Sequence, residues 1–260
     1  MKAITLNSVV PMRTSPHEQA EMCTQVLFAE TMTILKEEGA WAKIKLDADG
    51  YEGWVDRKMI STLSDEAFKD IKNAPKCAVA FPVSLAMSAE NQTTLLLSGG
   101  TKLPNYKNGT FELLGVKFNI DPSTVMPEGS KFDCTKVTNI ARFFLNTPYL
   151  WGGRNALGID CSGFVQMIYG IFGIQLPRDA SQQVNHGRVV DFLTEAKAGD
   201  LAFFENADKK IIHVGMMLDS ENIMHASGRV KINKIDAQGI VSEIDGTHTH
   251  RLRIIKRIHE

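Results

Sequence analysis

Hydrophobic and polar residues alternate along the first part of the chain with the period of two that is typical of β-strands. Glycines and the Asp49-Gly50 pair interrupt this alternation at short intervals, as turns between strands do. The pattern predicts a small antiparallel barrel. A short helix is expected next, over residues 64–75, because Ser64 can cap its first turn and Pro75 can end it. The alternating segments are residues 24–39, 40–46 and 51–56.

A second strand-rich block runs from Cys77 to about residue 123. Within it, Asn108-Gly109 lies between apolar segments and is a strong signal for a tight hairpin turn. The two blocks are similar in length, which two small barrels in tandem would explain. Residues 121–131 carry prolines and a glycine, so this segment is the best candidate for a domain boundary.

From Lys131 onward the hydrophobic period changes to that of a helix, and a run of alternating segments follows. Helices followed by strands predict an α+β domain with an antiparallel sheet. The expected helices are residues 134–145, 161–173 and 181–187, and the expected strands are residues 200–206, 213–218, 222–227 and 251–258.

The composition of the 260 residues is that of an ordinary globular protein, with 43% hydrophobic and 23% charged residues. Intrinsic disorder is therefore excluded as the general state. A net charge of −1 gives no electrostatic reason to bind nucleic acid or anionic lipid. No apolar run approaches the roughly 20 residues that span a bilayer. The N-terminus shows no apolar stretch of signal-peptide length, so we expect a cytoplasmic monomer, or a periplasmic or secreted protein if the native N-terminus was trimmed.

Cysteine usage points to one special residue. The four cysteines form no CxxC pair and are too sparse for a disulfide framework. Cys161, however, follows Asp160 at the start of a predicted helix, where Asp160 is a natural N-cap. The helix dipole and free N–H groups there can stabilise a thiolate and an oxyanion. The alternative is that Cys161 is a small buried hydrophobic residue.

A thiol nucleophile usually needs a base, and two of the seven histidines lie in apolar strands. If Leu218 pairs with Asn222, Gly215 faces His225. His213 and His225 are then diagonal neighbours on one sheet face, with their Cα atoms about 7–8 Å apart. One imidazole could then orient the other. Either histidine could instead be an ordinary strand residue, and the two could bind a metal with Cys161. The remaining five histidines lie in polar contexts and are expected to be solvated.

A loop with two glycines precedes the cysteine, and glycines allow close backbone approach to a ligand. Tyr149 lies twelve residues before Cys161, where its hydroxyl could donate to an oxyanion. Alternatively, Tyr149 and Trp151 are ordinary core aromatics.

Six motifs in order make residues 134–230 resemble the NlpC-type cysteine peptidases, a papain-like group that cuts bacterial cell-wall peptides. The resemblance implies that Cys161 is the nucleophile, that His213 is the base, that His225 orients it and that Tyr149 lies in the active site. Trp151, Asp160, Ser162, Arg178 and Asp179 would line the substrate cleft. The motifs are PYLWGG, GIDCSGFVQ, LPRDASQQ, AGDLAFF, HVGMML and MHASG.

Residues 13–30 and 50–55 are similar to a bacterial SH3-like domain of enzymes that recycle wall peptides. In that subgroup two SH3-like domains precede the catalytic domain, and the first reads the free amine of an N-terminal L-Ala. Glu21 and Tyr51 match the amine contact by motif position. Otherwise, Glu21 would lie on a solvated face and Tyr51 would pack in the barrel.

The resemblance implies an α+β papain-like peptidase domain behind two small SH3-like β-barrels. The expected activity is hydrolysis of the γ-D-glutamyl-L-diamino acid bond, where the diamino acid can be diaminopimelate or lysine. No cofactor and no metal are implied. Two alternatives are a non-catalytic wall-binding protein and an amidase or acyltransferase on the same scaffold. The predicted domains are residues 1–74, 75–125 and 126–260.

Overall fold

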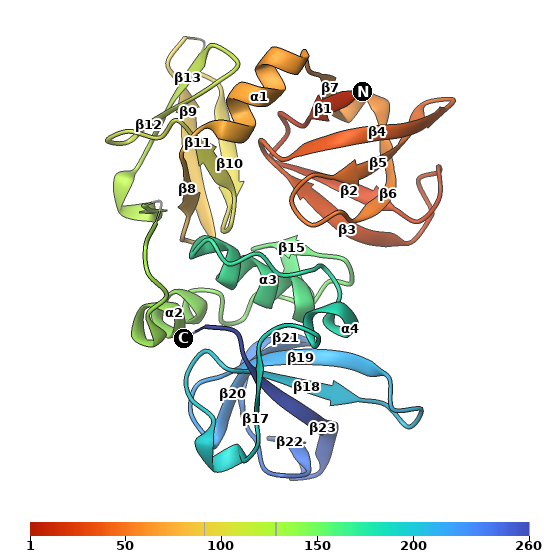
Figure 1. The fold of residues 1–260 in the computed structure, drawn as a ribbon, viewed down its shortest axis with the longest axis vertical. Helices are drawn as coiled ribbons and strands as arrows, with labels where there is room; N and C mark the ends of the chain where they lie inside the picture. Colours follow the sequence, from red (N-terminus) through yellow and green to blue (C-terminus); the bar gives the residue numbers. More distant parts are fainter. Residues whose placement is uncertain (91, 128, 260) are drawn as a thin grey trace. The chain divides into compact units, whose positions relative to one another are not determined.

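The computed structural model describes residues 1–90, 92–127 and 129–259 (Figure 1). By its internal contacts the chain divides into two compact units, and each is built from separate stretches of sequence. The first comprises Met1–Ser130, Trp151–Ala156 and Gly170–Gln175, and the second comprises Lys131–Leu150, Leu157–Tyr169 and Leu176–Glu260.

The N-terminal part of the first unit is an antiparallel sheet, as the alternation predicts. Its strands are β1 (Lys2–Ile4), β2 (Val9–Arg13), β3 (Met22–Leu27), β4 (Thr31–Glu38), β5 (Trp41–Leu46), β6 (Glu52–Asp56) and β7 (Ser61–Thr62), in the order β3-β2-β6-β5-β4-β1-β7. Alternate side chains such as Met32 and Ile34 on β4 and Ala42 and Ile44 on β5 point into one apolar core, which excludes water from that face of the sheet.

The predicted helix after this sheet is confirmed as α1 (Asp65–Asn73). Ser64 Oγ accepts from the backbone N–H of Ala67 at 3.1 Å, which is the N-cap bond expected for serine at this position. Ile71 is the buried residue of the helix, and Ala67 and Phe68 are partly buried against the same apolar core.

The second block of strands forms two antiparallel sheets of the first unit. The orders are β10-β9-β13-β12 and β11-β8-β14. Their core includes a stacked pair of rings, Phe111 and Phe118, with centroids 5.0 Å apart. The strands are β8 (Lys76–Val79), β9 (Val83–Ser88), β10 (Thr94–Ser98), β11 (Lys102–Pro104), β12 (Thr110–Leu113), β13 (Val116–Ile120) and β14 (Val125–Met126).

Two tight turns in this block show what the sequence could and could not predict. The Asn108-Gly109 turn forms as expected, with Lys107 and Thr110 exchanging backbone hydrogen bonds across it. The turn between β12 and β13 is built from Leu114 and Gly115, both at positive φ (51° and 81°). Leucine disfavours this left-handed conformation, so Leu114 provides no sequence signal for the turn.

In the second unit the helices are shorter than their hydrophobic patterns, and the sheet has more strands than predicted. The helices are α2 (Cys134–Arg142), α3 (Cys161–Ile171, with its last residues in the first unit) and α4 (Ala180–Gln183). The prediction that the first helix extends to residue 145 is wrong. The backbone N–H groups of Phe143 and Phe144 bond to carbonyl oxygens three residues earlier, as in a 3₁₀ turn, and the α-helix ends there. Within the described residues, α-helix is confined to α1–α4.

The sheet of the second unit has the order β17-β23-β18-β19-β20-β21, and β22 also pairs with β23. Its strands run antiparallel, as expected for this part of the chain. The strands are β17 (Arg188–Val190), β18 (Leu201–Glu205), β19 (Ile211–Met217), β20 (Asn222–Ser227), β21 (Arg229–Lys234), β22 (Gly239–Val241) and β23 (His248–Arg257). Two short strands outside this sheet precede them in sequence: β15 (Arg154–Asn155), whose residues belong to the first unit, and β16 (Gly158–Ile159).

None of the helices among the described residues has the length and apolar character needed to span a membrane.

Candidate active site

Cys161 lies in the first turn of α3, as the sequence predicts, and is buried. Asp160 caps this turn, because its Oδ1 accepts from the backbone N–H of Gly163 at 2.7 Å. The backbone N–H groups of Ser162 and of Val214 on β19 favour the ionised form of the sulfur. Since Val214 follows His213, the thiol lies beside the strand that carries the predicted base.

Burial decides the ionisation of this thiol. Removal from water, reinforced by the negative charge of Asp160, raises the pKa of Cys161 to about 11, although two backbone N–H groups and Arg178 act in the opposite direction. Desolvation thus opposes the stabilisation of a thiolate that the helix N-terminus offers. The thiol is protonated at neutral pH and must lose its proton to a base during attack.

A buried ion pair fixes the start of α3. The Arg178 guanidinium forms two bonds to the Asp160 carboxylate, Nη1 to Oδ1 at 3.0 Å and Nη2 to Oδ2 at 2.5 Å, and a third to Ser162 Oγ at 2.9 Å. Arg178 is only 2% exposed, so the pair is shielded from water. The structure thus brings together three predicted cleft residues, two of which are the sequence neighbours of Cys161. Asp179, another predicted cleft residue, is the N-cap residue of α4.

The predicted register of the two histidine strands is confirmed. Leu218 N–H bonds to Asn222 O at 2.8 Å, and Met216 pairs with Met224. Gly215 therefore faces His225, so closely that a Cβ at Gly215 would lie 2.9 Å from the Cβ of His225.

The two rings meet edge to face, with His213 Nε2 2.9 Å from His225 Nδ1. Burial lowers the pKa of both rings: that of His213 falls well below its usual range, with further lowering by His225, His250 and Lys231, and that of His225 falls to about 4. Both imidazoles are consequently neutral at physiological pH. A neutral imidazole next to a protonated thiol is a competent general base.

Two residues that the sequence analysis missed complete this cluster. Asn233 on β21 places Oδ1 3.1 Å from His225 Nε2. His250 on β23 stacks on His213, with ring centroids 4.2 Å apart and the planes tilted by 32°. Hydrophobic and polar residues alternate only weakly over residues 229–234, so β21 was not predicted. Without that strand, the position of Asn233 next to His225 could not be inferred.

The expectation that the other five histidines are solvated is wrong for two of them. His250 is half-buried against His213, and His259 stacks on Phe132 at a centroid distance of 3.9 Å. Both have polar neighbours in sequence but are covered by side chains from other segments, which a local pattern cannot reveal.

Tyr149 belongs to the same group as the thiol. Its backbone N–H bonds to Gly228 O at 2.9 Å. Burial, reinforced by the nearby Asp160 carboxylate and the ionisable Cys161, raises the pKa of the phenol to about 12. The hydroxyl is therefore protonated and can donate a hydrogen bond.

In the first unit, Trp151 Nε1–H donates to Glu21 Oε1 at 2.7 Å. Trp151 is 61% exposed, so the alternative interpretation of this residue as an ordinary core aromatic is wrong. Gly152 of the glycine loop has φ +75°, and a Cβ there would lie 2.5 Å from Met22 O, so this glycine packs closely against the protein's own backbone. Tyr51 is partly buried against the apolar core of the N-terminal sheet.

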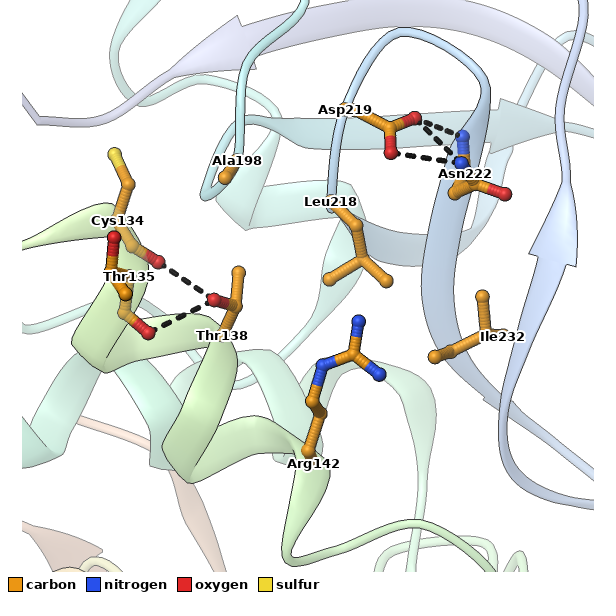
Figure 2. Close-up of a pocket in the computed structure, with 9 residues that line it drawn as sticks. All are labelled: Cys134, Thr135, Thr138, Arg142, Ala198, Leu218, Asp219, Asn222 and Ile232. Carbon is orange, nitrogen blue, oxygen red and sulfur yellow. Dashed lines mark hydrogen bonds between the residues drawn. The ribbon is translucent and has the colours of Figure 1, made fainter.

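Among the described residues, no group of three or more His, Cys, Asp or Glu side chains is arranged to hold a metal ion. A cavity of about 390 Å³ in the second unit is shown in Figure 2. It is lined by Cys134, Thr135, Thr138, Arg142, Ala198, Leu218, Asp219, Asn222 and Ile232, and includes none of the predicted site residues.

The comparisons with known proteins identify the family. Residues 146–248 match the NlpC/P60 family, and residues 12–60 match the bacterial dipeptidyl-peptidase SH3 domain. The chain belongs to the NlpC/P60 family of cysteine peptidases and carries a bacterial SH3 domain ahead of the peptidase domain.

Its relatives include two proteins named gamma-D-glutamyl-L-lysine dipeptidyl-peptidase. The protein from Bacillus subtilis (strain 168) is 31% identical over 217 residues, which cover 78% of this chain and 71% of the relative. The protein from Bacillus cereus (strain ATCC 10987 / NRS 248) is 27% identical over 260 residues, covering 87% and 74%. The crystal structure of an NlpC/P60 family protein from Bacillus cereus ATCC 10987 shares the fold, with a TM-score of 0.85 and 22% identity over the full length of both chains.

Proposed function

We propose that this protein is a γ-D-glutamyl-L-diamino acid endopeptidase that acts on cell-wall peptides with a free N-terminal L-Ala, in peptidoglycan recycling or degradation. The observation that carries the proposal is the buried Cys161 beside the strand of His213, whose ring bonds to His225. The two relatives named for the γ-D-glutamyl-L-lysine bond support the choice of substrate.

In the proposed mechanism, Cys161 Sγ attacks the γ-glutamyl carbonyl carbon while its proton passes to His213. The carbon–sulfur bond forms as the carbonyl π electrons move to oxygen. His213 then gives the proton to the leaving amine, the carbon–nitrogen bond breaks, and a thioester remains. A water molecule, deprotonated by His213, hydrolyses the thioester, and the proton returns to the thiolate.

The oxyanion of the tetrahedral intermediate would be held by the Cys161 backbone N–H and the Tyr149 hydroxyl. Tyr149 suits this task because burial keeps its hydroxyl protonated. A donor aimed at developing charge in a water-poor site is worth far more than one in solvent. His225 would hold the His213 ring in place, as the third group of a triad does.

We further propose that Glu21 and Tyr51 contact the free amine and that Trp151 forms part of the same wall. The Trp151 indole fixes one carboxylate oxygen of Glu21, and within the described chain no hydrogen bond occupies the second. That oxygen is available to an ammonium group. For Asp160, Ser162, Arg178 and Asp179 the proposal remains that they border the cleft, and the burial of the Arg178 pair favours support of Cys161 over direct contact.

For the domains we propose that residues 1–74 and 75–125 are two SH3-like barrels and that residues 126–260 are the peptidase domain. The sheet of β1–β7 supports the first assignment, and the two smaller sheets of β8–β14 support the second.

The test is mass spectrometry of L-Ala-γ-D-Glu-L-Lys and its diaminopimelate analogue after incubation with enzyme, each beside its N-acetylated twin and with Cys161→Ala as the blank. Release of the diamino acid from the free-amine peptides alone supports both the catalytic site and the amine contact. Equal cleavage of the acetylated peptides removes Glu21 and Tyr51 as readers of the amine. No cleavage, or equal cleavage by Cys161→Ala, contradicts the proposed function. Dependence on an acyl acceptor other than water would favour a transferase.

A further inference from the structure

A single line of hydrogen bonds runs through the second unit from a backbone carbonyl to the proposed base. It connects Val241 O, the Asn233 side chain, the His225 ring and the His213 ring, at distances of 3.0, 3.1 and 2.9 Å. We propose that Asn233 is a positioning residue that fixes the tautomers of both histidines, so that His213 presents an unprotonated Nδ1 to Cys161. The predicted effect of Asn233 on turnover rests on the proposed function, whereas the predicted tautomers do not.

The orientation of the Asn233 amide follows from its partner at one end. The Val241 backbone carbonyl can only accept, so the atom of Asn233 that faces it must be the Nδ2 donor. The acceptor Oδ1 then has to face His225. The flipped amide would set two oxygens against each other at one end, so the backbone of β22 leaves this side chain a single arrangement.

The tautomer of His225 follows from the amide. An oxygen 3.1 Å from Nε2 requires a hydrogen on that nitrogen. Because burial keeps the ring neutral, its other nitrogen, Nδ1, carries none and can only accept. Nδ1 is the atom that lies 2.9 Å from His213.

The tautomer of His213 follows in turn. An accepting Nδ1 on His225 requires that His213 Nε2 carries the hydrogen. In the neutral ring His213 Nδ1 is then a free lone pair, and this is the atom that can take the thiol proton. When it does, the new imidazolium keeps its Nε2–H bond to His225, so no other proton in the line has to move.

Burial makes the line effective. Asn233 is 4% exposed and His225 is 1% exposed, so water has little access to replace the amide oxygen. Within the described residues, the charged and titratable groups that act on His213 are His225 on β20, His250 on β23 and Lys231 on β21.

The first experiment reads the tautomers directly, by long-range ¹⁵N–¹H correlation spectra of the full chain labelled at histidine nitrogen. We expect Nε2–H and a bare Nδ1 on both rings of the wild-type protein at pH 7. In Asn233→Leu, which removes the hydrogen bonds but keeps the volume, the two rings should show mixed tautomers. A wild-type His213 with hydrogen on Nδ1, or unchanged spectra in Asn233→Leu, would overturn the inference.

The second experiment is kinetic. With the γ-D-glutamyl peptide, Asn233→Leu should lose about 10- to 100-fold in kcat with little change in KM. In Asn233→Asp, the new carboxylate favours the protonated form of the His225 ring. The Nδ1–H of that form faces His213 Nε2, so His213 can no longer keep its hydrogen on Nε2 and its lone pair on Nδ1. The acid limb of the kcat–pH profile should therefore move to higher pH. Ile235→Val, a conservative change in the same core, should alter neither property.

The outcomes separate this inference from the proposed function. If the wild-type protein cleaves no γ-D-glutamyl peptide, the proposed function fails, while the ring spectra still test the tautomers. If Asn233→Leu loses kcat but its spectra and the pH profile of Asn233→Asp stay as in the wild type, Asn233 supports the fold alone and the inference is wrong.

Discussion

Arg154 and Glu30 form a bidentate ion pair in which Nη2 lies 2.8 Å from Oε1 and Nη1 lies 3.0 Å from Oε2. The same guanidinium bonds to Gln25 O, and the Arg154 backbone N–H bonds to the Gln25 side chain, both at 2.7 Å. Residues 151–156 are thereby fastened to the N-terminal sheet within the first unit.

Replacing Arg154 by alanine should therefore destabilise the protein by about 2–3 kcal/mol, because Glu30 would lose its partner in a site that is largely closed to water. Urea unfolding measures the loss. The control is Lys58→Ala, which breaks the ion pair between Lys58 and Asp56. The Lys58 side chain is 76% exposed, so this pair lies in solvent. An equally small effect of both substitutions would show that the Arg154 pair contributes no more than a surface contact.

The thiol of Cys161 should react as a protonated group. Its pKa near 11 means that the thiolate fraction rises about tenfold per pH unit until the pH approaches that value. The rate of alkylation by iodoacetamide, followed by loss of activity, should accordingly keep increasing above pH 9. Cys161→Ala gives the background from the other three cysteines. A rate that is already constant near pH 6–7 would instead indicate a resting thiolate–imidazolium pair.

The buried histidines should make the protein less stable in mild acid. The pKa of His225 is lowered to about 4 in the folded state, below its value of about 6.5 in an unfolded chain, so between these values the unfolded state binds more protons. Stability should fall by about 3 kcal/mol from this residue as the pH drops from 6.5 to 4, and His213 acts in the same direction.

Urea unfolding at several pH values, compared with His225→Gln, tests this dependence. The variant should lose less stability over the same pH interval, because one of the two buried imidazoles is gone. Parallel curves for the two proteins would contradict the assignment of the acid sensitivity to His225.

A methyl group at position 215 should disturb the histidine pair. In Gly215→Ala the new Cβ would lie 2.9 Å from His225 Cβ and 2.7 Å from Ile223 Cδ1, so one of these residues has to shift. We expect kcat to fall at least tenfold and stability to fall by about 1–3 kcal/mol.

Gly170→Ala is the matched control for this substitution. The site lies within α3, and a Cβ there meets no atom within 4 Å. Helix propensity predicts unchanged or slightly increased stability and normal turnover. A kcat of Gly215→Ala equal to that of the control would show that the β19–β20 contact tolerates displacement.

Local chemistry made part of this structure predictable. The N-caps at Ser64 and Asp160 and the Asn108-Gly109 turn depend on residues adjacent in sequence, and the register of β19 against β20 follows from one short turn. The order of motifs identified the family. The features that were missed depend on distant parts of the chain.

Asn233 and His250 illustrate that limit. Each reaches the histidine pair from a strand whose partners are set by the complete sheet, and neither has an unusual sequence environment. The ionisation of Cys161 could not be predicted for a related reason, because the dipole of a helix is a local property whereas burial depends on everything packed around the sulfur.

The first unit is discontinuous in sequence, and this bears on how the protein can be made and divided. A ribosome releases residues 1–130 well before residues 151–156 and 170–175, which complete the unit. Until then Glu30 and Gln25 lack Arg154, and the backbone of Met22 lacks the glycine that lies against it. The SH3 region is therefore a poor candidate for excision or transplantation as an autonomous module, since a cut near residue 130 leaves part of its surface behind.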